Sequence, residues 1–369
     1  MDERVREHAR TLIDWSARIE AGDDVVVRVG PDAHDLAVAV AEVSGERGAN
    51  VVTTYASGEV TRAYLRAHDG DFEEDPEYER ALLANADAVL TLGGGRNTAA
   101  TADVPGERRQ AYDRARQDVR KARLDTKWVL TEHPTRALAQ QAGMSYEAYQ
   151  KFVYDAINRD WEAQAEKQSR VKDALDDARE VRIVSGDGTD LTMSVEGRVA
   201  VNSAASVDYD SHNLPSGEVF TAPSAAEGEV VFDVPMTING RQVTDAHLRF
   251  EGGRVVEHAA AQGEEAITEV LETDDGARRL GELGIGMNRG IDRVTDNILF
   301  DEKMGDTVHL ALGRAYESNF PAGREDEANE SAVHVDLITD MSEDSRIEVD
   351  GEVIQEDGTF WFEAGGPER

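Results

Sequence analysis

Two histidines and three carboxylates in the second half of the chain have side chains suited to binding divalent metal ions. His334 and Asp336 lie in the segment Ser331–Ile338, where alternating apolar residues predict a strand. Residues two apart on a strand point to the same face, so an imidazole and a carboxylate would project together. A His-x-Asp pair is also common on protein surfaces, and by itself this spacing is modest evidence for a metal site.

The other three candidates occur among apolar residues or glycines. His309 lies in the apolar run Val308–Leu312, and Glu218 and Glu282 lie in stretches without the pattern of a solvated face. A lone histidine in such a run is more often a core residue than a ligand, but a second histidine in the same domain favours a site. Buried carboxylates need a compensating charge, and the chain has few lysines to provide it. Divalent cations would do so.

The charges of this set indicate a two-metal centre. Glu218, Glu282 and Asp336 contribute three negative charges and neutral histidines none, so two divalent ions would leave the cluster at plus one. A bound hydroxide would neutralise that charge, which is the electrostatic condition for lowering the pKa of a metal-bound water toward ~7. The predicted chemistry is therefore hydrolysis by a metal-activated hydroxide.

The composition excludes several other kinds of site. The chain has 75 acidic and 39 basic residues, a net charge of -36, and the acidic residues are spread along its length. Such a surface repels a phosphate backbone, so nucleic-acid binding is not expected. The chain contains no cysteine, which excludes disulfides, thiol nucleophiles and thiolate ligands. Any metal must be bound by nitrogen and oxygen.

The same charge predicts a halophilic protein. Lysine occurs only at positions 121, 127, 151, 167, 172 and 303, so nearly all the positive charge is arginine. Self-repulsion destabilises the compact state unless the Debye length is short, about 3 Å at 1 M salt. We therefore expect folding to require high salt. An acidic surface for a basic partner is the weaker alternative, because the charge is delocalised.

A cytoplasmic location without membrane association is also expected. No apolar run approaches the ~18 residues that a membrane span needs. The first residues, Met1–Val5, lack the apolar segment of a secretion signal.

The sequence of residues 1–178 predicts an N-terminal α/β domain with a parallel sheet. Apolar residues recur at helical spacing in some segments, and continuous apolar runs occur in others. Their alternation is typical of β-α-β units. Helices are predicted over 2–20, 31–44, 106–125 and 145–178, and strands over 24–29, 50–55, 88–92 and 128–131.

The rest of the chain, residues 179–369, predicts a C-terminal mixed α+β domain that carries the metal site. From Glu180 onward the sequence changes to short alternating runs separated by Gly, Asp and Asn. A chain of 369 residues exceeds what one core usually supports, in keeping with two domains. Strands are predicted over 181–184, 191–195, 230–234, 246–250 and 255–258.

A glycine cluster, Gly93–Gly95, follows a predicted strand as a phosphate-binding loop would. Leu92–Asn97 lacks the third spaced glycine of a dinucleotide fingerprint, and no Walker lysine follows. A nucleotide-binding oxidoreductase is therefore a weak alternative that rests on the N-terminal half alone.

Five sequence blocks resemble, in their order, those of the aminopeptidase T / aminopeptidase S family of metallopeptidases. Ala142–Glu147 and Thr189–Leu191 also resemble segments of that family, so the similarity extends along the chain. The combination is highly specific, whereas residues 303–306 between two of the blocks depart from the family pattern. The blocks are 213–223, 276–282, 297–302, His309 with 311–316, and 334–336.

This resemblance implies a homodimeric, two-domain metallo-exopeptidase that removes N-terminal residues from peptides. It implies two divalent ions, which are cobalt, zinc, manganese or magnesium, and it places a catalytic tyrosine at Tyr316. The implied metal ligands are Glu218, Glu282, His309, His334 and Asp336.

The mechanistic hypothesis gives Glu282 the position between two ions roughly 3.5–4 Å apart. Tyr316 would donate a hydrogen bond to the developing oxyanion. The general acid/base stays open between Glu218 and Glu282. The alternative function is a non-catalytic metal- or peptide-binding homologue, against which the complete set of ligand residues argues.

Overall fold

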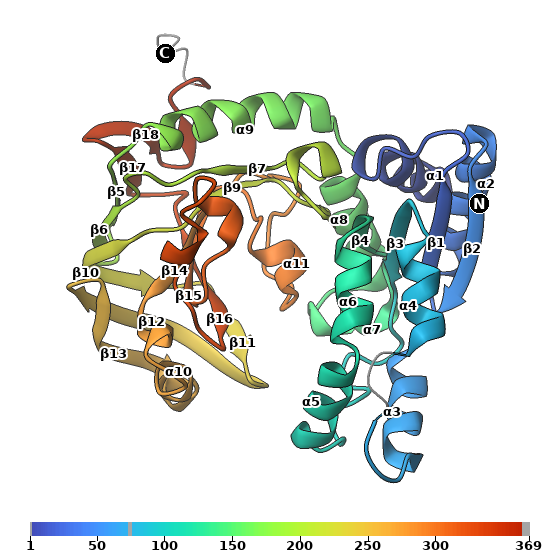
Figure 1. The fold of residues 1–369 in the computed structure, drawn as a ribbon. Coiled ribbons are helices and arrows are strands. Elements are labelled where there is room, and N and C mark those ends of the chain that lie inside the picture. The colour runs from blue at the N-terminus through green and yellow to red at the C-terminus, as the bar shows by residue number, and fades with distance from the viewer. Residues whose placement is uncertain (1, 73–75, 364–369) are drawn as a thin grey trace. The chain divides into compact units, whose positions relative to one another are not determined.

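The computed structural model describes residues 2–72 and 76–363, which form two compact units (Figure 1). The first unit comprises residues 1–159 and 205–215, and the second comprises 160–204 and 216–369. In the described part of the chain, no helix is both long enough and apolar enough to cross a membrane.

The first unit contains a five-stranded parallel sheet in the order β2-β1-β3-β4-β8. This sheet confirms the predicted α/β architecture, and each of the four predicted strands is correct to within one residue at either end. The fifth strand comes from the 205–215 segment and was not predicted. The strands are β1 (Asp24–Val29), β2 (Asn50–Tyr55), β3 (Ala88–Gly93), β4 (Lys127–Glu132) and β8 (Asn213–Leu214).

Helices connect these strands, and three of the predicted helices are each divided in two. The helix predicted over 2–20 is an α-helix followed by a π-helical turn, Thr11–Ser16, and the helix predicted over 106–125 is interrupted at Arg116. The helices are α1 (Glu3–Arg10), α2 (His34–Arg47), α3 (Gly58–Ala67), α4 (Glu77–Ala84), α5 (Gly106–Ala115), α6 (Gln117–Leu124), α7 (Arg136–Gln141) and α8 (Tyr146–Ile157).

The glycine cluster after β3 has a packing role. Gly94 has φ +156°, and a Cβ there would lie 3.0 Å from the Cβ of Ala33 in the loop after β1. The backbone N–H of Asp32 donates to Gly94 O at 2.9 Å. Glycine lets these two loops approach each other closely, so Gly94 has a packing role.

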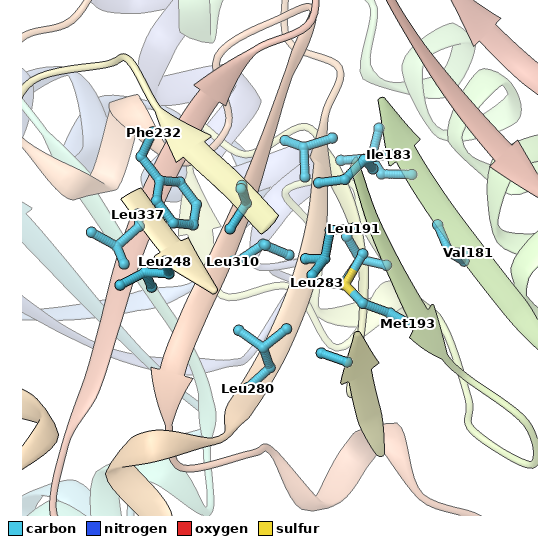
Figure 2. Packing of buried hydrophobic residues seen from close by; sticks show 14 of the residues in the cluster. Val181, Ile183, Leu191, Met193, Phe232, Leu248, Leu280, Leu283, Leu310 and Leu337 are labelled. Carbon is cyan, nitrogen blue, oxygen red and sulfur yellow. The ribbon is translucent and has the colours of Figure 1, made fainter. Parts of the chain in front are cut away.

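The second unit contains two antiparallel sheets with a shared apolar core. One sheet has the order β11-β12-β10-β6-β5-β17-β18-β19, with β13 paired to β12, and the other has the order β16-β15-β14-β9-β7. Figure 2 shows side chains of both sheets in this core, including Ile183 and Met193 from the first and Leu283, Leu310 and Leu337 from the second. The unit confirms the predicted α+β domain.

The elements of the second unit begin with a long helix, and most of the others are short strands. The helices are α9 (Trp161–Asp176), α10 (Glu264–Leu271) and α11 (Ile298–Asp301). The strands are β5 (Glu180–Ser185), β6 (Asp190–Ser194), β7 (Val201–Ser203), β9 (Glu218–Thr221), β10 (Ala225–Phe232), β11 (Met236–Ile238), β12 (Arg241–Glu251), β13 (Arg254–Gln262), β14 (Leu280–Gly286), β15 (Thr307–Gly313), β16 (His334–Asp340), β17 (Ser345–Val349), β18 (Glu352–Glu356) and β19 (Thr359–Phe360).

The two compact units are not divided near Ala178, where the sequence predicts the boundary between the domains. The predicted helix over 145–178 is two helices, because α8 ends at Ile157 and a new helix, α9, begins at Trp161. Asp160 caps the start of α9, where its side chain accepts a hydrogen bond from Ala163 N at 3.0 Å. Helix α9 belongs to the second unit, since Val171 and Leu175 lie in its core. The buried Gln168 also donates to Ser203 O of β7 and Glu218 O of β9, at 3.0 and 2.8 Å.

Candidate metal centre

One face of the antiparallel sheet β16-β15-β14-β9-β7 in the second unit carries all five predicted ligands. Glu282 on β14 lies opposite Ala311 on β15, and Ala311 lies opposite Asp336 on β16. Directly opposed residues share a face, as do residues two apart on one strand. By this register His309, His334 and Glu218 also point to that face, while the alternate row Leu283, Leu310 and Leu337 faces the core.

Three of the five form a tight buried group. Ligand atoms of Glu218, Glu282 and His309 all lie within 4.8 Å of one another. His309 Nε2 is 2.9 Å from Glu282 Oε1 and 3.7 Å from Glu218 Oε2. Each of these residues is at most 5% exposed. Their side chains come from three adjacent strands, β9, β14 and β15.

His334 and Asp336 extend this group along the same face. His334 Nε2 lies 3.7 Å from Glu282 Oε2 and 3.6 Å from Asp336 Oδ1. Glu282 thus directs one oxygen at each histidine, Oε1 at His309 and Oε2 at His334. A carboxylate placed in this way can be shared by two adjacent cations.

Two local features orient the histidines. An ideal Cβ at Gly284 would lie 2.0 Å from His309 Cε1, so the imidazole occupies the space that any side chain there would need. His334 Nδ1 donates to Arg314 O at 2.7 Å, because a carbonyl can only accept. This hydrogen bond leaves Nε2 of His334 as the atom that faces the carboxylates.

The sequence interpretation missed two charged residues of this site, Glu302 and Lys303. The fully buried Lys303 pairs with Glu302 Oε1, and its Nζ lies 3.6 Å from Glu218 Oε1. The signal that could have found them was a rare lysine directly after one of the family-like blocks. Their charges cancel, so the charge count made from the other three carboxylates is unchanged.

Burial and mutual proximity shift the pKa values of these groups. Burial raises the pKa of Glu218 to about 7. Burial alone would lower the pKa of both histidines, but their carboxylate neighbours raise it to about 10 for His309 and about 9 for His334. Glu282 has the largest part in the shift of His309, and Asp336 in that of His334.

Tyr316 lies beside the cluster and is 40% exposed. Its ring centroid is 5.0 Å from that of His334 and 6.1 Å from that of Phe220. Burial of the phenol and the nearby carboxylates raise the pKa of Tyr316, so the hydroxyl keeps its proton at neutral pH. It can therefore act as a hydrogen-bond donor.

The residues present fit a divalent metal. Within the described residues, Glu218 Oε2, Glu282 Oε2 and His309 Nδ1 are buried without a hydrogen-bond partner. Unpaired buried polar atoms are costly, and two of the three are carboxylate oxygens directed at histidines. Imidazole nitrogen and carboxylate oxygen are the donor set of zinc, cobalt and manganese sites.

Metal binding is expected to release protons. Because the pKa of His309 is raised to about 10 and that of His334 to about 9, we expect both to be protonated at pH 7.5 in the metal-free protein. Metal ligation requires them to be neutral. Saturation with metal should release about two protons per chain, and apparent affinity should fall as the pH is lowered below 9. Titration of the chelator-treated protein in weakly buffered solution measures this, and binding without proton release would contradict it.

Comparison with known proteins places the chain in a family. The model of the thermophilic metalloprotease family, M29, matches residues 1–365. The chain belongs to the M29 family. Within related sequences, it is 31% identical to aminopeptidase T of Thermus aquaticus, over 97% of this chain and 96% of that protein. It is 27% identical to aminopeptidase AmpS of Bacillus subtilis, over 98% and 99% of the two chains.

Two solved structures share the fold of this chain. Wild-type AmpT of Thermus thermophilus superimposes with a TM-score of 0.82 at 26% identity, covering 97% of this chain and 99% of that one. A 2,5-dihydroxypyridine dioxygenase of Pseudomonas putida gives a TM-score of 0.57 at 14% identity, over 97% and 96% of the two chains. At that identity the likeness shows only a shared fold. The family resemblance drawn from the sequence blocks is thus confirmed.

Proposed function

We propose that this M29 protein is a metalloaminopeptidase that releases N-terminal residues from peptides at a two-metal centre. The observation that carries the proposal is the position of Glu282, whose two oxygens face two different histidines at 2.9 and 3.7 Å. The aminopeptidase names of its relatives support the reaction class.

In this proposal Glu218, Glu282 and His309 would hold one cation, and Glu282, His334 and Asp336 would hold the other. Two divalent cations, as cobalt, zinc, manganese or magnesium, would supply Lewis acidity and a water of lowered pKa. The hydroxyl of Tyr316 donates a hydrogen bond to the oxyanion that develops on the scissile carbonyl. Glu218 and Glu282 are the two candidates for proton transfer.

Release of free amino acids from short peptides tests the function. The protein would be purified in molar KCl and assayed with and without chelator, then with Co, Zn, Mn or Mg restored. Stepwise release from the N-terminus that is lost on chelation and regained with metal supports the proposal. Binding of two metal ions per chain without release from any peptide would instead establish the alternative, a non-catalytic metal- or peptide-binding homologue.

Tyr316→Phe is expected to lower kcat about 10²-fold while KM and metal content change little. In this proposal the phenol stabilises the transition state, and loss of one oxyanion donor typically has an effect of this size. Steady-state kinetics with metal analysis measure it. Full turnover of the metal-loaded variant would remove Tyr316 from the mechanism.

We further propose that the protein is halophilic. The acidic excess of 75 to 39 residues supports this, because repulsion among so many carboxylates is screened only at high ionic strength. The melting temperature of the metal-loaded protein should rise steadily as KCl is increased from ~0.1 M to ~2 M. A chelated protein that is fully stable at low ionic strength would contradict this.

A homodimer and a cytoplasmic location complete the proposal. Both derive from the sequence, the dimer through the family resemblance. Light scattering coupled to size-exclusion chromatography, in molar KCl, measures the oligomer directly.

A further inference from the structure

Lys303 is buried in a chain whose other lysines are on the surface. Its side chain has no exposed area. The side chains of Lys121, Lys127, Lys151, Lys167 and Lys172 are 30% to 75% exposed. A buried ammonium without a compensating partner is strongly disfavoured, so this position needs a reason.

The backbone holds Lys303 in a fixed place at the end of the α11 segment. Its N–H donates to Phe300 O at 3.0 Å, and its carbonyl accepts from Asn288 N at 3.1 Å. Asn288 in turn donates through Nδ2 to Ser216 O at 2.8 Å, two residues before Glu218. The lysine is thereby tied to the segment that leads into β9.

The ammonium contacts two carboxylates, one of which belongs to the candidate metal centre. It pairs with Glu302 Oε1, and it lies 3.6 Å from Glu218 Oε1. The other oxygen of that carboxylate, Glu218 Oε2, has no hydrogen-bond partner and faces His309 Nε2 at 3.7 Å. Lysine and a cation at Oε2 can therefore neutralise the same carboxylate from different sides.

We propose that Lys303 is a resident counter-charge of the metal centre, which keeps the buried carboxylates Glu218 and Glu302 paired when no metal is bound. The inference rests on the proposed two-metal centre. Removing one member of a buried ion pair leaves the other charge uncompensated. A cation at Oε2 gives Glu218 a second partner, so the loss of the ammonium should be less damaging in the metal-loaded protein.

Melting temperatures of wild type and Lys303→Met, each with chelator and with Mn or Zn in molar KCl, test this. Methionine keeps an unbranched side chain of similar length and removes the charge. We expect the chelated variant to melt roughly 6–15 °C below wild type, and the metal-loaded variant to lose less than half as much. Lys172→Met, which removes a surface pair with Asp176, is the matched control and should show the same small change under both conditions.

The outcomes separate this proposal from the proposed function. An equal loss with and without metal would make Lys303 a purely structural residue and overturn the proposal. If the melting temperature of the wild type did not respond to metal, the proposed metal centre would be contradicted, and with it this inference.

Failure of the variant to fold is also decisive. Folded Lys303→Met recovered only from metal-containing medium would support the proposal, because metal then replaces the ammonium. Failure in both media would overturn it. Glu302→Gln with Lys303→Met provides a milder second case, since Glu218 alone then loses its partner. A smaller, still metal-dependent loss supports the proposal, and a metal-independent loss contradicts it.

Discussion

Glu282→Gln is expected to lower peptide release by more than ~10²-fold and to reduce bound metal below two ions per chain. Glutamine has nearly the same shape but is neutral, so it is a much weaker ligand. Glu282 is the carboxylate whose oxygens face both histidines, at 2.9 Å from His309 and 3.7 Å from His334. Loss of its charge therefore affects both proposed cation positions at once.

Metal analysis of the dialysed protein and initial rates on one short peptide measure this effect. Glu265→Gln is the control, because Glu265 is an exposed residue in the first turn of α10 on the same unit. The control should keep wild-type metal content and rate. If Glu282→Gln also kept two metal ions and full turnover, a shared Glu282 would be wrong.

Gly284→Ala is expected to disrupt the same site by steric means alone. The new methyl group would lie 2.0 Å from Cε1 and 2.1 Å from Nε2 of His309, so the imidazole must leave its contact with Glu282. Overpacking of this kind costs about 1–3 kcal/mol of unfolding free energy. Metal content and peptide release should fall nearly as far as in His309→Ala.

A double-mutant cycle isolates the contact. In a His309→Ala background the clash is absent, so Gly284→Ala should then cost little stability, and the two changes should be strongly non-additive. Gly45→Ala in α2 is the control, because a Cβ there meets nothing within 4 Å. Additive effects of Gly284→Ala and His309→Ala would contradict the packing of this imidazole over Gly284.

The local pattern of the sequence predicted much of the fold. The segments Asp24–Val29 and Asn50–Tyr55, both rich in β-branched residues, were correctly identified as strands, because strand propensity is a short-range property of the sequence. The interruptions of the predicted helices at Arg116 and at Asn158–Asp160 were missed. The helices that follow them, α6 and α9, are as rich in charged residues as the helices before them, so the helical sequence pattern shows no change at either point. The fifth strand, β8, has only two residues and pairs with a strand about eighty positions earlier, which no local window reveals.

By itself the sequence determined the residue types of the candidate site, the nitrogen and oxygen ligand chemistry, the acidic surface and the family. These depend on composition and on short blocks such as His334–Asp336. Only the tertiary structure decided that the five residues share one sheet face, that Gly284 makes room for His309 and that Lys303 lies buried against Glu218. The physical reason is that register between strands and the burial of a charge are set by contacts between distant segments, which spacing along the chain does not encode.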